Sequence, residues 1–200
     1  MPAPAPMIVA RFPGIGAARG YQINFGWGLR AERHTIETTV SNLPNTRIGN
    51  LTLTDTIGGQ SLTLHYCKLE DMSPRGDGVV DVAFLDRRWL WADGIIDGDY
   101  NYFDPKLQLT IRNRTARELA RLLLDAMKEG AADIDALPND VRPRKSWNAA
   151  NPAAELEQLA AEFGCVAMLD PITDRVRICR FSEGAPLPEG PAIIRLAGLA

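Results

Sequence analysis

The sequence has few of the features that mark membrane, secreted or metal-binding proteins. No apolar run approaches the roughly 20 residues that a membrane-spanning helix needs. The N-terminus has no basic region of the kind that opens a signal peptide. The 3 cysteines form no CxxC or CxxH pair, which argues against a disulfide framework and against structural zinc. We therefore expect reduced, buried cysteines, a reducing cytoplasm, no cofactor and no membrane partner.

An excess of charge of one sign is also missing. The chain carries 22 basic and 25 acidic residues, a net charge of -3 at pH 7, so it has no electrostatic footprint for specific nucleic-acid binding. Hydrophobic residues make up 46% of the 200 positions, enough for one sizeable core or two small ones. The composition therefore predicts a folded protein whose partners are mainly other proteins.

Motifs that carry chemistry are scarce. The 2 histidines, His34 and His65, accompany no recognisable nucleophile arrangement. The glycines of residues 14–20 are not followed by the helix that a dinucleotide loop requires. The aspartates of residues 93–104 lack the ligand order of an EF-hand. We therefore predict no catalytic, cofactor-binding or metal-binding residues, and no enzyme activity.

The first half of the chain has the pattern of short β-strands. Residues 48–56, 61–69, 79–85 and 95–100 alternate or concentrate β-forming side chains, as do the shorter segments 7–12, 21–27 and 35–41. Glycines at 58–59 predict a turn between two of these strands. Residues 1–105 are thus predicted to form an antiparallel β-barrel or sandwich, preceded by a flexible tail at 1–6.

The second half has helical spacing. Thr115 and Glu118 match a capping box ahead of an apolar helix, which Gly130 is predicted to end. Asn151 and Pro152 are suited to the cap and first turn of a second helix, and two strands at 165–169 and 175–181 follow it. Residues 106–183 therefore predict a helix–loop–helix–β-hairpin module, giving an α+β fold class. Residues 184–200 are expected to be a linker with a possible final strand.

Three segments resemble phage tail hub (baseplate hub) proteins in a fixed order. LDRRWLWADGIIDGDYN is similar to a hub "LDRRW" strand followed by a "G-I-x-G-x-YN" strand. IRNRTARELARLLLDAM resembles the hub "T-x-x-E-L" helix. SWNAANPAAELEQLAAEFGCVAMLDPITDRVRI resembles the "W-x-x-x-N-P-x-x-x-L" helix and its hairpin. Together these segments cover about half of the chain, residues 81–180.

The resemblance implies a barrel-like hub fold and a structural role in the virion. It implies a ring oligomer, often a trimer, at the distal tail, in contact with distal tail, tape-measure and fibre or spike proteins. DNA would pass through the lumen without specific contacts, and the chain would reside in the host cytoplasm before assembly. Hub proteins usually carry a second barrel-like domain, for which 200 residues leave little room.

The side chains most suited to anchor such an assembly are aromatic residues and the arginines beside them. Trp89 and Trp91 are predicted to share one face of a strand. The full set of interface or core anchors that we predict is Trp89, Trp91, Arg87, Arg88, Tyr100, Asn101 and Trp147.

Two other functions remain open from the residues alone. A tail-associated cell-wall hydrolase would need a carboxylate pair across a cleft, for which Glu32, Glu37 and Asp55 are candidates. A carbohydrate- or nucleic-acid-binding barrel would expose Trp89 and Trp91 to its ligand.

Overall fold

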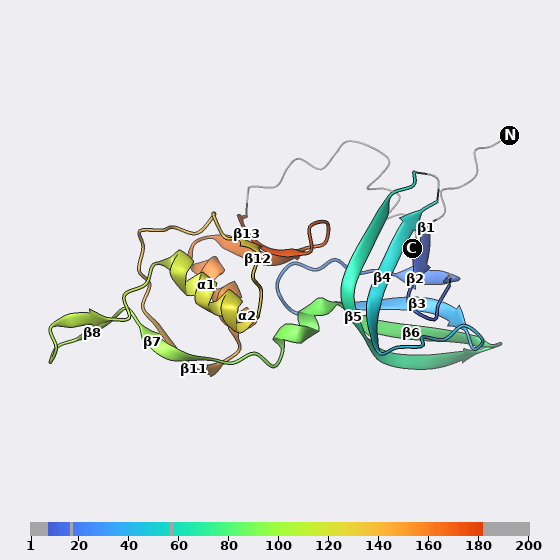
Figure 1. The fold of residues 1–200 in the computed structure, drawn as a ribbon, viewed down its shortest axis with the longest axis horizontal. Helices are drawn as coiled ribbons and strands as arrows, with labels where there is room; N and C mark the ends of the chain where they lie inside the picture. Colours follow the sequence, from blue (N-terminus) through green and yellow to red (C-terminus); the bar gives the residue numbers. More distant parts are fainter. Residues whose placement is uncertain (1–7, 17, 57, 182–200) are drawn as a thin grey trace.

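The computed structural model describes residues 8–16, 18–56 and 58–181, which form two parts joined end to end (Figure 1). The predicted tail, linker and possible final strand lie outside these residues. In chain order the elements are β1 (Ile8–Arg11), β2 (Gly20–Gln22), β3 (Arg33–Thr39), β4 (Ile48–Asp55), β5 (Ser61–Gly76), β6 (Val79–Leu85), the 3-10 helix η1 (Arg87–Trp91), β7 (Ile96–Tyr100), β8 (Tyr102–Asp104), β9 (Leu109–Ile111), α1 (Ala116–Ala126), β10 (Ala132–Asp133), β11 (Lys145–Ala150), α2 (Pro152–Glu162), β12 (Cys165–Asp170) and β13 (Arg175–Arg180).

The barrel, our name for β1–β6, is one antiparallel sheet in the order β1-β4-β5-β6-β3-β2. Its edges approach each other, because the Ala18 amide before β2 donates to the Ala10 carbonyl of β1 at 3.0 Å. The alternating strands bury one apolar side chain of every two, and Ile36, Leu51, Val82 and Phe84 fill the interior. The predicted α+β fold class with a barrel-like antiparallel domain is therefore confirmed.

A β-bulge in β5 changes which side chains enter the barrel. Gly49 pairs with Cys67 and Leu51 with Leu64, so two residues of β5 oppose one of β4. Tyr66, at φ 52°, is turned outward, and the predicted alternation through residues 62–68 is wrong beyond Leu64. Cys67 points into the core instead, where burial raises the pKa of its thiol to about 12. Cys165 is buried as predicted, whereas Cys179 is only half-buried.

The hairpin between β5 and β6 is longer than the sequence suggests. The strand predicted at 61–69 continues as far as Gly76, and only Asp77 and Gly78 make the turn. Both turn residues have positive φ, 50° and 73°, as a two-residue type I′ turn requires. β4 accompanies β5 only to Lys68, so residues 70–76 pair with β6 alone. We call this stretch the free edge.

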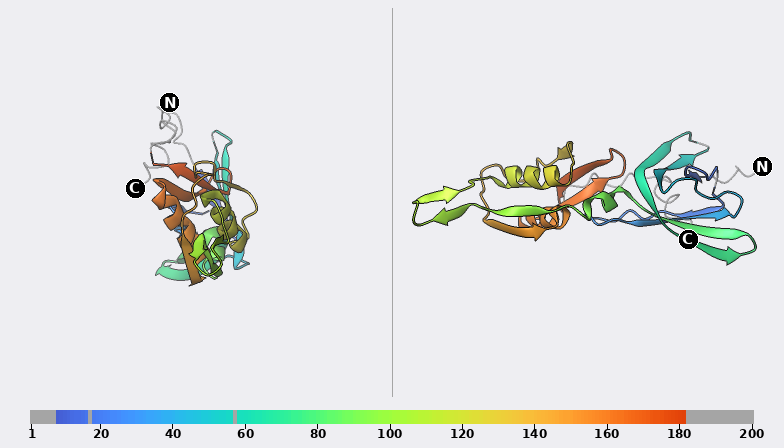
Figure 2. Two further views of the ribbon diagram at one scale, coloured as in Figure 1. Left: turned by 90° about the vertical axis from the view of Figure 1, so that its left-hand side faces the viewer. Right: turned by 60° about the horizontal axis from the view of Figure 1, so that its bottom comes forward.

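The helical part, from β7 to β13, has its own core. Its two helices lie between the β7–β11 ribbon and the sheet β10-β13-β12 (Figures 1 and 2). Leu119, Leu123, Leu156 and Leu159 are fully buried there, and each contributes about 2 kcal/mol by leaving water. β7 pairs with β11 across the boundary that we predicted at residue 105, so residues from both sides of that position share this core.

Capping side chains set the helix starts. Thr115 and Glu118 form the predicted capping box of α1, and the Asn151 side chain accepts from the amides of Ala153 and Ala154 at the start of α2. The predicted end of α1 at Gly130 is wrong, because Lys128 takes the left-handed conformation at φ 62°. Its amide donates to Asp125 and that of Glu129 to Leu124, the two bonds of a Schellman motif. Glu129 is thereby held immediately beyond the helix.

Replacing Lys128 by glycine should stabilise the protein, because glycine adopts a positive φ without the steric cost that lysine bears. We expect Lys128→Gly to raise the free energy of unfolding by about 0.5–1 kcal/mol in urea titrations. The matched control is Arg121→Gly in the middle of α1, which should lower it by about 1 kcal/mol. A loss of stability in both variants would contradict the assignment of this helix end.

Candidate functional site

The two parts of the chain meet at η1, which follows the last barrel strand. Asp86 caps it by accepting from the Arg88 amide at 3.1 Å. The predicted strand through Trp89 and Trp91 is wrong, because the capped 3-10 turn sends the two indoles to different places. Trp91 is 1% exposed within the core of the helical part. Trp89 lies against the barrel, where its indole N–H donates to the Tyr66 carbonyl at 2.8 Å and the Lys68 ammonium lies over its ring.

Arg87 connects three segments that are distant in sequence. Its guanidinium donates to the Asp174 carboxylate at 2.7 Å and the Asp174 carbonyl at 2.8 Å, in the turn between β12 and β13. It also donates to both carboxylate oxygens of Glu129 beyond α1. Glu129 accepts in addition from the Trp91 indole at 2.9 Å. Only 8% of the Arg87 side chain is exposed, so this is a largely buried ionic network. We call these four residues the joint.

Arg88 holds the segment between β2 and β3 over the joint. Its guanidinium forms a bidentate pair with Asp86 and donates to the carbonyls of Gly26 and Gly28 at 3.2 and 2.9 Å. The strand predicted at 21–27 accordingly stops at Gln22, because the chain then leaves the sheet. The Leu29 amide donates to the Glu157 carboxylate of α2. The segment therefore spans from the barrel to the helical part.

Asp86 is the electrostatic centre of the barrel side. Burial raises its pKa, but the His34 imidazole and the Arg88 guanidinium lower it by more, so the net pKa lies below its usual value. The Nδ1 atom of His34 accepts from the Asn24 amide at 3.2 Å, which assigns the imidazole proton to Nε2. Nε2 lies 3.8 Å from the Asp86 carboxylate, longer than a hydrogen bond.

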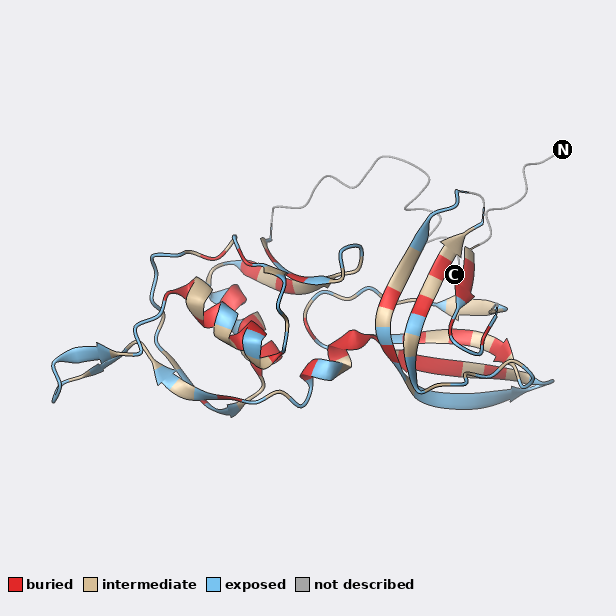
Figure 3. Ribbon diagram, viewed as in Figure 1, coloured by how far each residue is buried: buried red, intermediate tan, exposed pale blue. Residues whose placement is uncertain are grey.

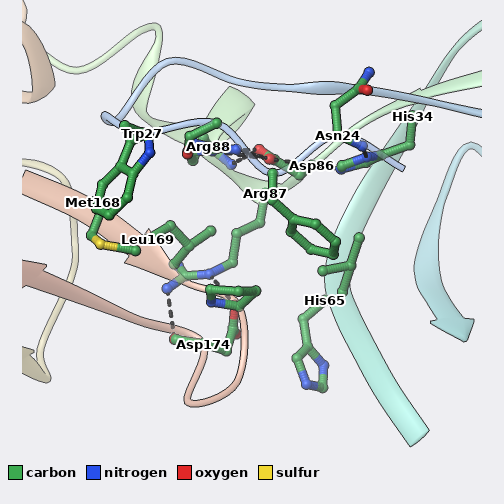
Figure 4. Close-up of a pocket in the computed structure, with 14 residues that line it drawn as sticks. Asn24, Trp27, His34, His65, Asp86, Arg87, Arg88, Met168, Leu169 and Asp174 are labelled. Carbon is green, nitrogen blue, oxygen red and sulfur yellow. Dashed lines mark hydrogen bonds and ion pairs between the residues drawn. The ribbon is translucent and has the colours of Figure 1, made fainter. Parts of the chain in front are cut away.

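A cavity of about 180 Å³ lies beside these residues, between the barrel and the β12–β13 turn (Figure 4). Its apolar lining comes from Phe25, Trp27, Leu64, Met168, Leu169 and Pro171. Its charged lining consists of Asp86, Arg87, Arg88 and Asp174, which are bound to one another. Of these charges, Arg87 and Asp174 join the two parts, whereas Asp86 and Arg88 form a pair within the segment that leaves the barrel.

The remaining predicted anchors lie along the helical part. The rings of Tyr100 and Trp147 pack 5.1 Å apart across the β7–β11 ribbon. The Trp147 indole donates to the Glu155 carboxylate of α2 at 2.9 Å. Asn101, at φ 57°, donates to the carbonyls of Arg114 and Pro143 and accepts from the Arg114 amide.

Sequence reasoning missed the acidic partners Glu129, Asp174 and Glu157. No local pattern marks them, because each meets its partner through tertiary packing. For Glu129 and Asp174, the signal that could have indicated an acidic partner is Arg87, which directly follows a buried strand, since a buried guanidinium requires a carboxylate. Glu157 accepts from a backbone amide, and no signal in the sequence indicates it.

The aspartates that suggested a cation site instead support local backbone and side-chain groups. Asp97 accepts from the Ala149 amide at 2.5 Å, Asp99 from the Ser146 hydroxyl at 2.6 Å and Asp104 from the Lys106 amide at 2.8 Å. Among the residues that the structure describes, no group of three or more His, Cys, Asp or Glu side chains could hold a metal. In the same residues, no helix is long and apolar enough to cross a bilayer.

Comparison with known proteins identifies the fold but no family. No protein-family model matches the sequence, and no curated protein matches it significantly. Among solved structures, the 43 kDa tail protein of prophage MuSo2 from Shewanella oneidensis is similar at a TM-score of 0.58 and 19% identity, over 89% of this chain and 54% of that one. A tail protein from Neisseria meningitidis MC58 matches at a TM-score of 0.44 and 12% identity, over 88% and 52%.

The first of these similarities shows that the chain has the fold of a phage tail protein. The chain spans about half of the length of that protein, 54%, so the similarity concerns one portion of it.

Removing the arginine of the joint should uncouple the two parts. We expect Arg87→Met to lower the free energy of unfolding by about 3–5 kcal/mol, because it leaves the Glu129 carboxylate buried without its cation. Arg87→Lys should cost less, since it keeps the charge but loses the planar fork. The control is Arg75→Met, whose side chain is 60% exposed beside Glu37 and Asp81 and should cost less than about 1 kcal/mol. Equal losses for Arg87→Met and Arg75→Met in urea titrations would contradict the role of the joint.

The lowered pKa of Asp86 predicts a pH dependence. Its contribution to stability is complete above the ordinary aspartate pKa, about 4, and is lost as the pH falls through the lower pKa of the folded state. We expect Asp86→Asn to have a lower free energy of unfolding than wild type at pH 7. Urea titrations below about pH 4 should show a smaller difference between the two free energies. The exposed Asp140→Asn should differ little from wild type at either pH. If the difference in the free energy of unfolding between wild type and Asp86→Asn stayed constant down to pH 3, the lowered pKa of Asp86 would be refuted.

Proposed function

We propose that the chain is a structural subunit of a phage tail tip or baseplate hub. In this role it forms a ring at the distal tail, with a trimer as the expected stoichiometry, and links the tail tube, the tape-measure protein and fibre or spike proteins. The observation that carries the proposal is the fold shared with a prophage tail protein along 89% of the chain. The order of the hub-like segments in the sequence supports it independently.

The joint suits a protein whose task is to hold a shape. Arg87 with Glu129 and Asp174 binds the end of the barrel to the helical part, and Arg88 with Asp86 holds the segment between β2 and β3 in place. The buried aromatic anchors Trp91 and Trp147 each donate their indole N–H to a glutamate, so they stiffen the chain internally. Contacts with neighbouring subunits are left to the side chains at the surface.

Large apolar side chains are exposed in several places on that surface, as expected of a subunit that packs against others. Near the joint these are Phe25, Trp27, Leu90, Ile95 and Ile172, and at the far end of the helical part they are Tyr102, Phe103, Leu107 and Leu109. Such residues suit the centres of protein–protein contacts. DNA in the lumen of the proposed ring would meet a chain of slight negative net charge, which favours passage over binding.

The two other functions have less support. In the sheet order, two strands lie between Asp55 of β4 and Glu37 of β3, and Glu37 is bound to Arg75. These carboxylates therefore do not form the close pair that a glycosidase uses. Trp91 is buried, and the Lys68 ammonium occupies one face of the partly buried Trp89 ring, which disfavours a stacking platform formed by the two indoles.

Immunogold labelling of virions tests the proposal directly. Antibodies against the purified chain should label the distal end of the tail, because the proposed ring is part of the mature particle. Antibodies against a capsid protein of the same particle provide the control for specificity. Absence of the label from intact virions, with the chain present in the infected lysate, would refute a structural tail role.

A further inference from the structure

A small hairpin projects from the end of the helical part that lies farthest from the barrel (Figure 2). It consists of β8 and β9, and we call residues 102–112 the arm. Asn101 clamps its base through the bonds to Arg114 and Pro143 described above. Beyond the base, the arm extends away from both parts and is exposed along nearly its whole length (Figure 3).

The arm gains little stability from its own chain. Its two strands pair through only three residues each, and an isolated two-stranded hairpin is at best marginally stable in water. Phe103, Leu107 and Leu109 nevertheless remain 53%, 60% and 48% exposed. Three apolar side chains on a rigidly based projection indicate that the arm is built to pack against another molecule.

The arm and its base are basic. Lys106 and Arg112 lie in the arm with one carboxylate, Asp104, and Arg142 and Arg144 lie beside its base. Arg112 stacks over Tyr100 and Arg144 over Tyr102, but none of the four forms an ion pair with any residue in the described part of the chain. Their charges are therefore available to an acidic partner.

The barrel carries an acidic surface at the opposite end of the molecule. A groove of about 420 Å³ runs along the outer face of β2, β3, β6 and β5 and is lined by Glu37, Asp71 and Asp81 with Arg33 and Arg75. Glu70 pairs with Arg33 at the border of the groove, so four carboxylates accompany two arginines on this surface. Arg33 is paired with Glu70, and Arg75 with Glu37 and Asp81. Asp71 accepts from the Ser73 hydroxyl and forms no ion pair with any residue that the structure describes.

The free edge of β5 forms one border of this groove. Residues 70–76 have β6 on one side and no described strand on the other. The edge presents backbone groups without a strand partner, and Asp71 places negative charge on its groove face. The half-exposed Met72 lies on the other face of β5, beside its strand partner Val82, which belongs to the barrel core. The edge thus combines negative charge with an apolar side chain, the counterparts of the basic and apolar side chains of the arm.

We infer that the arm of one copy docks on the free edge and acidic groove of the next copy. The two surfaces lie at opposite ends of the molecule, so the contact is heterologous and repeats head to tail, which generates a ring where the rotation closes. Apolar residues of the arm supply the centre of the contact, and the opposed charges select the register and speed the encounter. The inference rests on the proposed ring assembly and names the surfaces that form it.

A charge-exchange experiment tests the docking. The arm variant is Lys106→Glu/Arg112→Glu, and the groove variant is Glu70→Lys/Asp71→Lys. All four positions are exposed, so both variants should fold, which circular dichroism and thermal unfolding verify. Sedimentation velocity measures the protein concentration at which half of the molecules are assembled. The measurement uses the full chain, once at low salt and once at physiological salt.

We expect each variant alone to raise that concentration by about tenfold or more, because each places like charges opposite one another. A chain carrying all four substitutions should return to within a few-fold of wild type, since the exchanged charges attract again. The control Arg30→Glu/Arg121→Glu makes the same change in net charge as the arm variant at exposed positions away from both surfaces, and should have little effect.

The inference would be overturned if the chain with all four substitutions assembled no better than either variant alone. It would also be overturned if the arm variant assembled like wild type. A wild-type chain that stays monomeric at all concentrations and salts would overturn it as well. In each case the labelling of virions decides the tail role separately, so failure of the docking and failure of the proposed function remain distinguishable.

Discussion

The arrangement of the whole chain depends on one buried guanidinium. Arg87 leaves the barrel at the start of η1 and is bound by Glu129 and Asp174, which belong to two different elements of the helical part. Because an unpaired charge at this depth is costly, the arginine is stable only when both acidic segments are in place. The arrangement of the barrel against the helical part therefore depends on the end of α1 and on the β12–β13 turn, which place the two carboxylates.

This dependence explains two features that are locally unfavourable. Lys128 accepts a left-handed conformation because the Schellman motif that it completes delivers Glu129 to the joint. The segment between β2 and β3 gives up its strand pairing after Gln22 because its carbonyls satisfy Arg88. In both places, tertiary contacts with an arginine override the local preference of the backbone.

Local signals in the sequence predicted the helices and many of the strands. The capping residues Thr115 and Asn151 and the alternation in β4 and β6 are short-range properties, and the structure has them where the sequence indicated. The predictions that were wrong depend on distant residues. The bulge at Tyr66 is defined by register against β4, and the turn at η1 is defined by Asp86 and the packing of Trp91. The acidic members of the joint come from residues 129 and 174, which no spacing rule links to residue 87.

Pro74 lies in the free edge of β5, and its position has a consequence for how such a chain avoids aggregation. An unpaired strand invites any other strand to extend the sheet, and indefinite extension is how ordered aggregates grow. Proline has no amide hydrogen to offer, and the neighbouring Asp71, Ser73 and Arg75 are polar or charged. The edge is thus closed to indiscriminate strand addition, which favours partners that recognise its side chains over those that only extend its backbone ladder.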